Sequence, residues 1–116
     1  MTEFVFRCGL EAVLGLLNGK WKLLILYHLQ AERLRFGALR RSVGDVSEKM
    51  LSQQLKDMAS DGLVRRIDHK TVPPHVEYEL TPLGRDLTER LRPLCDWGSE
   101  NMDKIVTITS ERAAAA

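Results

Sequence analysis

Four polar side chains near the middle of the chain have the types and the spacing to bind a polyanion. They are Lys49, Ser52, Gln53 and Lys56. At about 100° per residue they share one side of a helix, and Leu51, Leu55 and Met58 share the opposite side. Lysine can reach guanine acceptors, glutamine can pair with adenine through two hydrogen bonds, and serine can bond to bases or phosphates. The set therefore indicates either a surface that reads the DNA major groove or an ordinary solvated face.

Capping residues define the helix that carries these side chains. Ser47 is a typical N-cap, and Glu48 places a carboxylate at the positive end of the helix. Asp61 and Gly62 end it, because a glycine after the last turn readily adopts the left-handed C-cap conformation. We expect a helix over residues 47–61 and include Ser47 among its DNA contacts.

Further cations flank this helix on both sides. Arg40 and Arg41 should project outward from a preceding helix over residues 36–43, where they could hold phosphates or form a solvated pair. After the helix comes a hairpin with five more candidates: Arg65, Arg66, His69, Lys70 and His75. Neighbouring strand residues point to opposite faces, so at most one of Arg65 and Arg66 should face DNA.

The charge is unevenly distributed, although the net charge is only +1. Residues 33–70 contain nine Lys or Arg against five Asp or Glu, and the rest of the chain contains eight against eleven. A basic middle between acidic ends is a mild electrostatic footprint for a polyanion. Chance clustering on a solvated surface is the alternative.

Periodicity and turn signals predict the remaining elements. Helices are expected over residues 9–18, 20–30, 36–43, 47–61 and 82–109, and strands over residues 63–68 and 76–80. In the second strand, Glu77 and Glu79 should point outward and the alternate residues Val76, Tyr78 and Leu80 inward. Thr81-Pro82 begins the last helix, and Pro93 predicts a kink or restart near Arg92.

This order of elements is typical of a winged helix-turn-helix protein, with residues 47–61 as the recognition helix. We predict a mainly α fold with a small two-stranded β-hairpin, extra N- and C-terminal dimerisation helices, and a single domain over residues 1–116. A length of 116 residues and a content of 44% hydrophobic residues are typical of a single domain with one hydrophobic core. The absence of a long apolar run, a secretory h-region and a disulfide framework favours a reduced, cytoplasmic protein without a membrane partner.

Several motifs, taken in order, resemble the HxlR-type winged-helix transcriptional regulators. They are Cys8, GKWKLLIL (19–26), RFGALRR (35–41), SEKMLSQQLKDMASDGLVRR (47–66), VPPHVEYELTPLG (72–84) and Trp97, spread over residues 8–98. The resemblance implies a dimeric DNA-binding regulator, which we expect to be a repressor, whose first and last helices form the dimer interface. In several family members the cysteine matching Cys8 senses electrophiles or oxidants. The sequence departs at His75, where arginine is usual, so the wing's charge contact should be weaker or depend on pH.

Residues that bear on assembly and regulation lie near the two ends. The expected dimer interface consists of Leu10, Leu14, Leu91, Leu94 and Trp97, because one small winged-helix core cannot bury them all. A two-fold dimer implies an inverted-repeat operator. Cys8 stands beside Arg7 near a helix start, and both features favour a reactive thiolate; a buried packing role is the alternative. Cys95 should only pack.

Other function classes find less support. No Gly-rich phosphate loop appears, and a Cys8–His28 pair would lack an oxyanion element and an orienting carboxylate, so we expect no enzyme. The three histidines have no ligand spacing with the cysteines, so we expect neither a metal nor another cofactor. No residue identifies a small-molecule effector. The competing hypothesis is a dimeric module that binds a partner protein, which salt would weaken far less than DNA binding.

Overall fold

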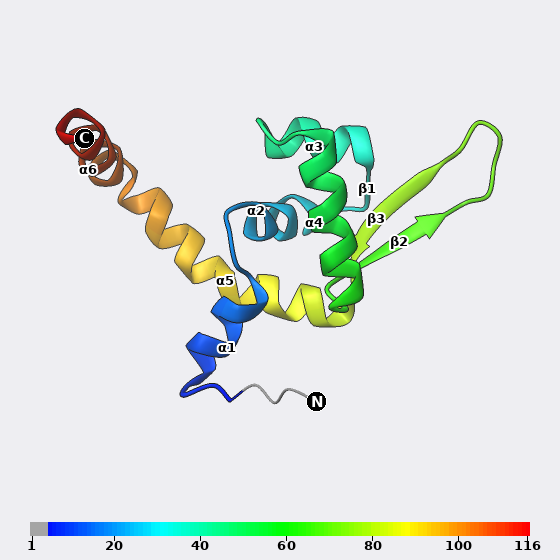
Figure 1. The fold of residues 1–116 in the computed structure, drawn as a ribbon, viewed down its shortest axis with the longest axis horizontal. Coiled ribbons are helices and arrows are strands. Elements are labelled where there is room, and N and C mark those ends of the chain that lie inside the picture. The colour runs from blue at the N-terminus through cyan, green and yellow to red at the C-terminus, as the bar shows by residue number, and fades with distance from the viewer. Residues whose placement is uncertain (1–4) are drawn as a thin grey trace. The chain divides into compact units, whose positions relative to one another are not determined.

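The computed structural model describes residues 5–116 (Figure 1). Its helices are α1 (Gly9–Leu16), α2 (Trp21–Leu29), α3 (Phe36–Val43), α4 (Glu48–Ser60), α5 (Pro82–Glu100) and α6 (Met102–Ala115). Its strands are β1 (Leu34–Arg35), β2 (Val64–Asp68) and β3 (Val76–Leu80). The chain forms two compact units, of which the first ends at Arg85 and the second comprises Asp86–Ala116. The first unit therefore contains every element from α1 to β3 and the first turn of α5.

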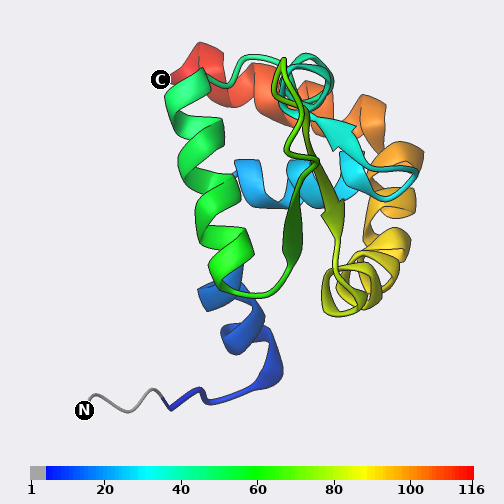
Figure 2. The same ribbon diagram turned by 90° about the vertical axis from the view of Figure 1, so that its right-hand side faces the viewer.

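The core of the first unit is built around α2. Ile25, Leu26 and Leu29 of this helix are fully buried, and α2 packs against α3, α4 and β3 (Figures 1 and 2). The buried partners from the other elements are Leu39, Val46, Leu51, Leu55, Met58, Leu63, Val64 and Leu80. Residues 20–30 thus form the buried helix that the sequence predicted, although Leu23 and Tyr27 remain exposed on its outer side.

The sheet has three antiparallel strands in the order β1–β3–β2, not the two that were predicted. The additional strand pairs Leu34 with Tyr78 and Arg35 with Glu77. A strand of two residues is too short to display the alternation by which a strand is recognised, so only the tertiary structure reveals it. β2, β3 and the connecting residues 69–75, together called the wing, project away from α2 and α3 (Figure 1).

The capping signals at the two ends of α4 act as predicted. The Ser47 hydroxyl oxygen accepts a hydrogen bond from the Met50 backbone N–H at 3.0 Å. At the other end Gly62 has a φ of +80°. Its N–H donates to the Ala59 carbonyl at 3.1 Å, and the Leu63 N–H donates to the Met58 carbonyl at 2.9 Å. These two bonds form a Schellman C-cap, which satisfies the last carbonyls of the helix.

The start of α5 is held tightly against the turn that follows α4. The Thr81 hydroxyl accepts from the Gly84 N–H at 3.0 Å, which confirms Thr81 as the N-cap, and donates to the Gly62 carbonyl at 2.5 Å. A Cβ atom at Gly84 would lie 2.0 Å from the Leu63 carbonyl oxygen. Only glycine permits this close approach of the two backbones.

Two helix boundaries differ from the prediction. α1 ends at Leu16, two residues before the predicted end at Asn18. Residues 82–109 contain no restart near Arg92: α5 continues through Pro93, and the interruption falls at Asn101, whose φ of −109° and ψ of 16° leave the helical region. The Asn101 side-chain amide donates to the Trp97 carbonyl at 2.9 Å, a local bond that competes with helix continuation.

Candidate nucleic-acid interface

The predicted polar face of α4 is exposed to solvent along its whole length. Leu51, Leu55 and Met58 are at most 1% exposed and hold the helix against the core. Lys49, Ser52, Gln53 and Lys56 are all exposed on the other side. Within residues 5–116, the side chains of Lys49, Ser52 and Lys56 form no hydrogen bond or ion pair with another residue. The face therefore presents cationic and hydroxyl groups that are available to an external ligand.

Gln53 is the exception on this face because it has an intramolecular partner. Its Nε2 donates to Asp57 Oδ1, one turn further along α4, at 3.0 Å. Pairing with a base would require this exposed bond to break. Ser47 is also engaged, since its oxygen caps the helix, which leaves its hydroxyl hydrogen and one acceptor lone pair for another partner.

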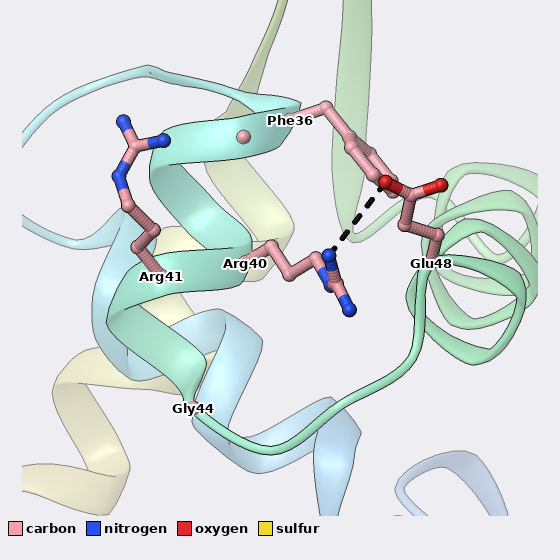
Figure 3. Close-up of a pocket in the computed structure, with 6 residues that line it drawn as sticks. Phe36, Arg40, Arg41, Gly44 and Glu48 are labelled. Carbon is pink, nitrogen blue, oxygen red and sulfur yellow. Dashed lines mark ion pairs between the residues drawn. The ribbon is translucent and has the colours of Figure 1, made fainter.

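The turn between α3 and α4 separates the roles of the two neighbouring arginines (Figure 3). Arg40 was expected to point outward, but its Nε donates to the Val46 carbonyl at 3.0 Å, and its NH1 lies 3.6 Å from a Glu48 carboxylate oxygen. These contacts tie α3 to the start of α4. Arg41 projects in a different direction and is exposed. A hollow of about 380 Å³ between them is lined by Phe36, Gly37, Arg40, Arg41, Gly44 and Glu48.

On the wing, Arg65 and Arg66 lie on opposite faces as expected. Arg65 is paired across the strands with Glu79 and binds its carboxylate, and Arg33 reaches the same carboxylate at 3.8 Å. Hydrogen bonding to Arg65 is the main cause that holds the pKa of Glu79 below its ordinary value. The charges of Arg33, Arg65 and Arg85 act in the same direction, and desolvation opposes them. Arg66 lies 3.8 Å from Asp68 and is half exposed.

The two glutamates of β3 do not point freely into solvent, which corrects the predicted pattern. The side chains of Glu77 and Glu79 are each only 18% exposed. Glu79 is covered by arginines, and Glu77 is contacted by His69 and His75. Alternation placed these carboxylates on the correct strand face, but it could not reveal that Arg65 of β2, Arg33 before β1 and the two histidines of the wing tip cover that face.

The tip of the wing contributes one cation without a side-chain partner among residues 5–116. Lys70 is exposed and has a φ of +53°, and its backbone N–H donates to Asp68 Oδ1 at 2.8 Å. This local turn leaves the Lys70 ammonium group in solvent. The predicted wing contact His75 instead lies 3.3 Å from Glu77.

Both cysteines are exposed and free. Cys8 is the N-cap of α1, and its backbone carbonyl accepts from the Ala12 N–H at 3.2 Å. The neighbouring Arg7 forms an ion pair with Glu11 at 2.9 Å, so its charge is shared with a carboxylate. Cys95 was expected to be packed among apolar residues, but in the single chain it lies on the exposed side of α5.

Apolar side chains of the predicted dimer interface are exposed in the single chain. On α1, Leu10 is 68% and Leu14 is 60% exposed. In the second unit, Leu94 is 63% and Trp97 is 57% exposed, while Leu91 is half-buried. Val106 and Ile108 of α6, in the same unit, are 55% and 53% exposed. No helix among residues 5–116 is both long and apolar enough to cross a bilayer.

Comparison with known proteins gives a consistent result. Residues 16–106 match the HxlR-like helix-turn-helix family. The HTH-type transcriptional regulator YtfH of Escherichia coli K12 is 43% identical over 111 residues, which cover 96% of this chain and 88% of YtfH. YtcD of Bacillus subtilis 168, also an HTH-type transcriptional regulator, is 40% identical over 105 residues, covering 90% and 83%. The redox regulator HypR in its reduced form superposes with a TM-score of 0.79 at 35% identity, covering 86% of this chain and 99% of HypR.

Proposed function

Since this chain belongs to the HxlR-like helix-turn-helix family of transcriptional regulators, we propose that it binds operator DNA as a homodimer, with α4 in the major groove. One observation carries this proposal. α4 buries Leu51, Leu55 and Met58 and leaves an opposite face of lysine, serine and glutamine open to solvent. A major groove offers the acceptors and donors that such a face can bind.

The contacts divide into base-reading and phosphate-binding groups. Gln53 and the lysines of α4 approach base edges, and Ser52 bonds to a base or a phosphate. Arg41, Arg66 and Lys70 bind phosphates on either side, because they are exposed and lie on the turn helix and the wing. Arg40, Arg65 and Ser47 act as positioning residues, since each is engaged within the protein.

The exposed apolar residues support the proposed dimer. Leucines at 60–68% exposure on α1 and Leu94 with Trp97 in the second unit form more apolar surface than a small monomer normally leaves in water. A two-fold pair would set the recognition helices about 34 Å apart, or a multiple of that, on an inverted repeat. Bound over a promoter in the cytoplasm, such a dimer represses by excluding the polymerase.

Cys8 is the proposed sensor of this regulator. It is exposed at the N-terminal end of α1, and the similar protein HypR is a redox regulator. A modified Cys8 on a dimerisation helix would change the spacing of the two recognition helices. A preference of about 1.4 kcal/mol for an arrangement that cannot span both half-sites lowers operator affinity tenfold.

The decisive experiment selects genomic DNA fragments that bind the purified protein, reduced and oxidised, and then measures the salt dependence of binding to the recovered site. Five exposed cations per subunit, Arg41, Lys49, Lys56, Arg66 and Lys70, predict a slope of log K against log salt as steep as about −9 if all of them meet phosphates in the dimer. Lys70→Ala should reduce the slope, and the matched control Lys104→Ala on α6 should not.

The competing function, a winged-helix module that binds a partner protein, gives different results. It predicts no enriched DNA site and a slope near zero, and that outcome would replace the DNA-binding proposal. The dimer has its own test. Leu94→Asp changes a side chain exposed in the single chain, so it should leave the fold intact and convert a sedimenting dimer into a monomer. A parent protein that sediments as a monomer at micromolar concentration would contradict the dimer.

A further inference from the structure

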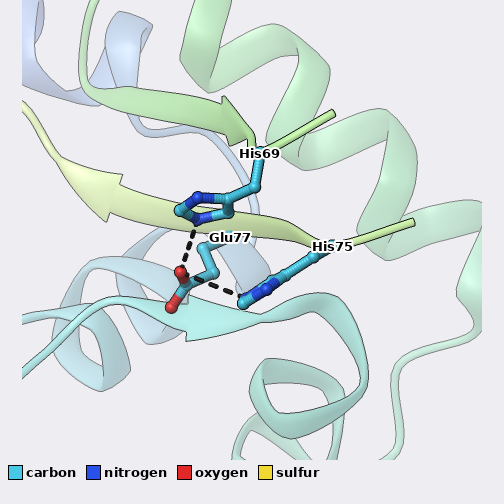
Figure 4. Close-up of side chains that lie close together, drawn as sticks. All are labelled: His69, His75 and Glu77. Atoms are coloured by element: carbon cyan, nitrogen blue, oxygen red, sulfur yellow. Dashed lines mark hydrogen bonds and ion pairs between the residues drawn. The ribbon is translucent and has the colours of Figure 1, made fainter. Parts of the chain in front are cut away.

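Two histidines and a glutamate meet where the wing begins to turn (Figure 4). His69 follows β2, and His75 directly precedes β3, which carries Glu77. The His69 N–H donates to the His75 carbonyl at 2.9 Å, so the two histidines are neighbours across the hairpin. Glu77 lies two residues after His75 and therefore shares its face. The register of the hairpin gathers three potential metal ligands on one side of the wing.

One carboxylate oxygen lies between the two imidazole rings. Glu77 Oε1 is 2.7 Å from His69 Nε2 and 3.3 Å from His75 Nε2. The ring centroids are 4.3 Å apart, and the ring planes are inclined by 40°. Donor atoms from all three residues lie within 4.8 Å of one another. Both histidines therefore direct the same nitrogen, Nε2, toward the same carboxylate.

The two distances to Glu77 are close to the ligand–ligand distances of a tetrahedral zinc site. With metal–ligand bonds of about 2.0–2.1 Å, the ligand atoms of such a site lie about 3.3 Å apart. The pair of His75 and Glu77 already has this separation, and His69 and Glu77 need to move apart by about 0.6 Å. The three side chains are 33%, 39% and 18% exposed, so rotations of surface side chains can supply this adjustment.

The donor set selects the class of metal. Two imidazole nitrogens and one carboxylate suit Zn²⁺ and its first-row neighbours, whereas Mg²⁺ and Ca²⁺ prefer oxygen ligands. Three protein ligands leave a fourth position for water. We propose that the wing binds one divalent transition-metal ion through His69 Nε2, His75 Nε2 and the Glu77 carboxylate.

Metal binding at this position would act directly on the wing tip. The ion would join the end of β2 to the start of β3 and close the loop of residues 70–74 between them. With neutral imidazoles, it would also change the charge of the cluster from −1 to +1, because one divalent cation is added to one carboxylate. The site is inferred from the wing alone, so it stands whether or not the wing contacts DNA.

The test is a Zn²⁺ titration of the full chain, without a histidine tag, in competition with a chromogenic chelator. Both exposed cysteines are first replaced, Cys8→Ser and Cys95→Ser, because thiolates also bind zinc. The single variants His69→Ala, His75→Ala and Glu77→Gln are compared in this background, and circular dichroism verifies that each is folded. His28→Gln on α2 is the matched control, since it removes a histidine elsewhere in the chain.

We expect one Zn²⁺ per chain, bound at least tenfold more weakly by each of the two histidine variants and unchanged in His28→Gln. Co²⁺ should give the visible absorption of a tetrahedral site, and that absorption should disappear in His75→Ala. A loss smaller than tenfold in either histidine variant overturns the proposal. So does an equal loss in His28→Gln, or a parent that binds no more tightly than the double variant His69→Ala/His75→Ala.

Discussion

Replacing Gln53 by alanine removes the one amide on the exposed face of α4 that can read a base through two hydrogen bonds. In the free protein its Nε2 donates to Asp57 at 3.0 Å on the helix surface. Water replaces such an exposed bond at little cost, and alanine has the higher helix propensity. Gln53→Ala should therefore fold as stably as the parent, so any loss of DNA binding reports the interface.

The expected loss follows from the two partners of Gln53. A bidentate pair with adenine contributes about 1–3 kcal/mol of discrimination. The bond to Asp57 must break first, and because water replaces this exposed bond, the offset lies at the low end of the usual range, about 0.5 kcal/mol. We expect a net loss of about 0.5–2.5 kcal/mol, or about 2- to 70-fold in Kd for the operator. Asp57→Ala should bind more tightly than the parent, because it frees the amide and removes a carboxylate from a face that meets phosphates.

The assay is fluorescence anisotropy with the selected operator and with single-base substitutions of it, at fixed salt. Gln54→Ala is the matched control: this neighbouring side chain is half-buried, and its Nε2 donates to the Met50 sulfur at 3.4 Å. It should keep the sequence preference of the parent. If Gln53→Ala retains the full preference, or if Gln54→Ala loses as much, the assignment of the reading face is refuted.

Four other predictions address the turn, the backbone, the wing and the thiol. Arg41→Ala should reduce the salt slope of DNA binding by about one unit per half-site. Arg40→Ala should chiefly lower the melting temperature, because Arg40 bonds to Val46 and Glu48. If the two variants have equal slopes and equal melting temperatures, this division of roles is contradicted. Gly84→Ala should lower the free energy of unfolding, measured by denaturant titration, by about 1–3 kcal/mol, because its Cβ would clash with the Leu63 carbonyl oxygen. Gly98→Ala is the control and should be neutral or stabilising, because its Cβ would have no neighbour within 4 Å. The pKa of Glu79 is lowered from 4.5, so its contribution to stability is complete above pH 4.5 and is lost as the pH falls through the lowered value. The melting temperature, measured at a series of pH values, should therefore fall less steeply in acid for Glu79→Gln than for the parent. Glu89→Gln should behave like the parent. Diamide or a quinone should abolish operator binding by the parent and by Cys95→Ser but not by Cys8→Ser, and unchanged binding after full modification of Cys8 would leave that thiol without a regulatory role.

The order of helices α1 to α4 and of the two wing strands, and the two faces of α4, could be determined from the sequence alone. The reason is that both depend on short-range signals. Leu51, Leu55 and Met58 recur at helical spacing, Ser47 caps one end, and Gly62 permits the C-cap at the other. A helix period and a cap involve residues within four positions of one another, so no knowledge of distant packing is needed.

Tertiary structure decided which of the cations remain available. Arg40 and Arg41 are adjacent and chemically identical, yet only the path of the α3–α4 turn brings the Val46 carbonyl to Arg40. The two-residue strand β1 could not be predicted from the sequence either, because its partner Tyr78 lies more than forty residues away in the chain. Pairings of this range carry no local pattern, and neither their register nor their partners follow from periodicity.

The wing gives the clearest division between the two kinds of information. Alternation in residues 76–80 identified the strand and the common face of Glu77 and Glu79. The covering of these carboxylates depends on which residues of β2 lie opposite and on where the tip folds back. Cross-strand register placed Arg65 on Glu79 and brought His69 beside His75, so a pair of histidines without ligand spacing in the sequence became neighbours with their Nε2 atoms on one carboxylate.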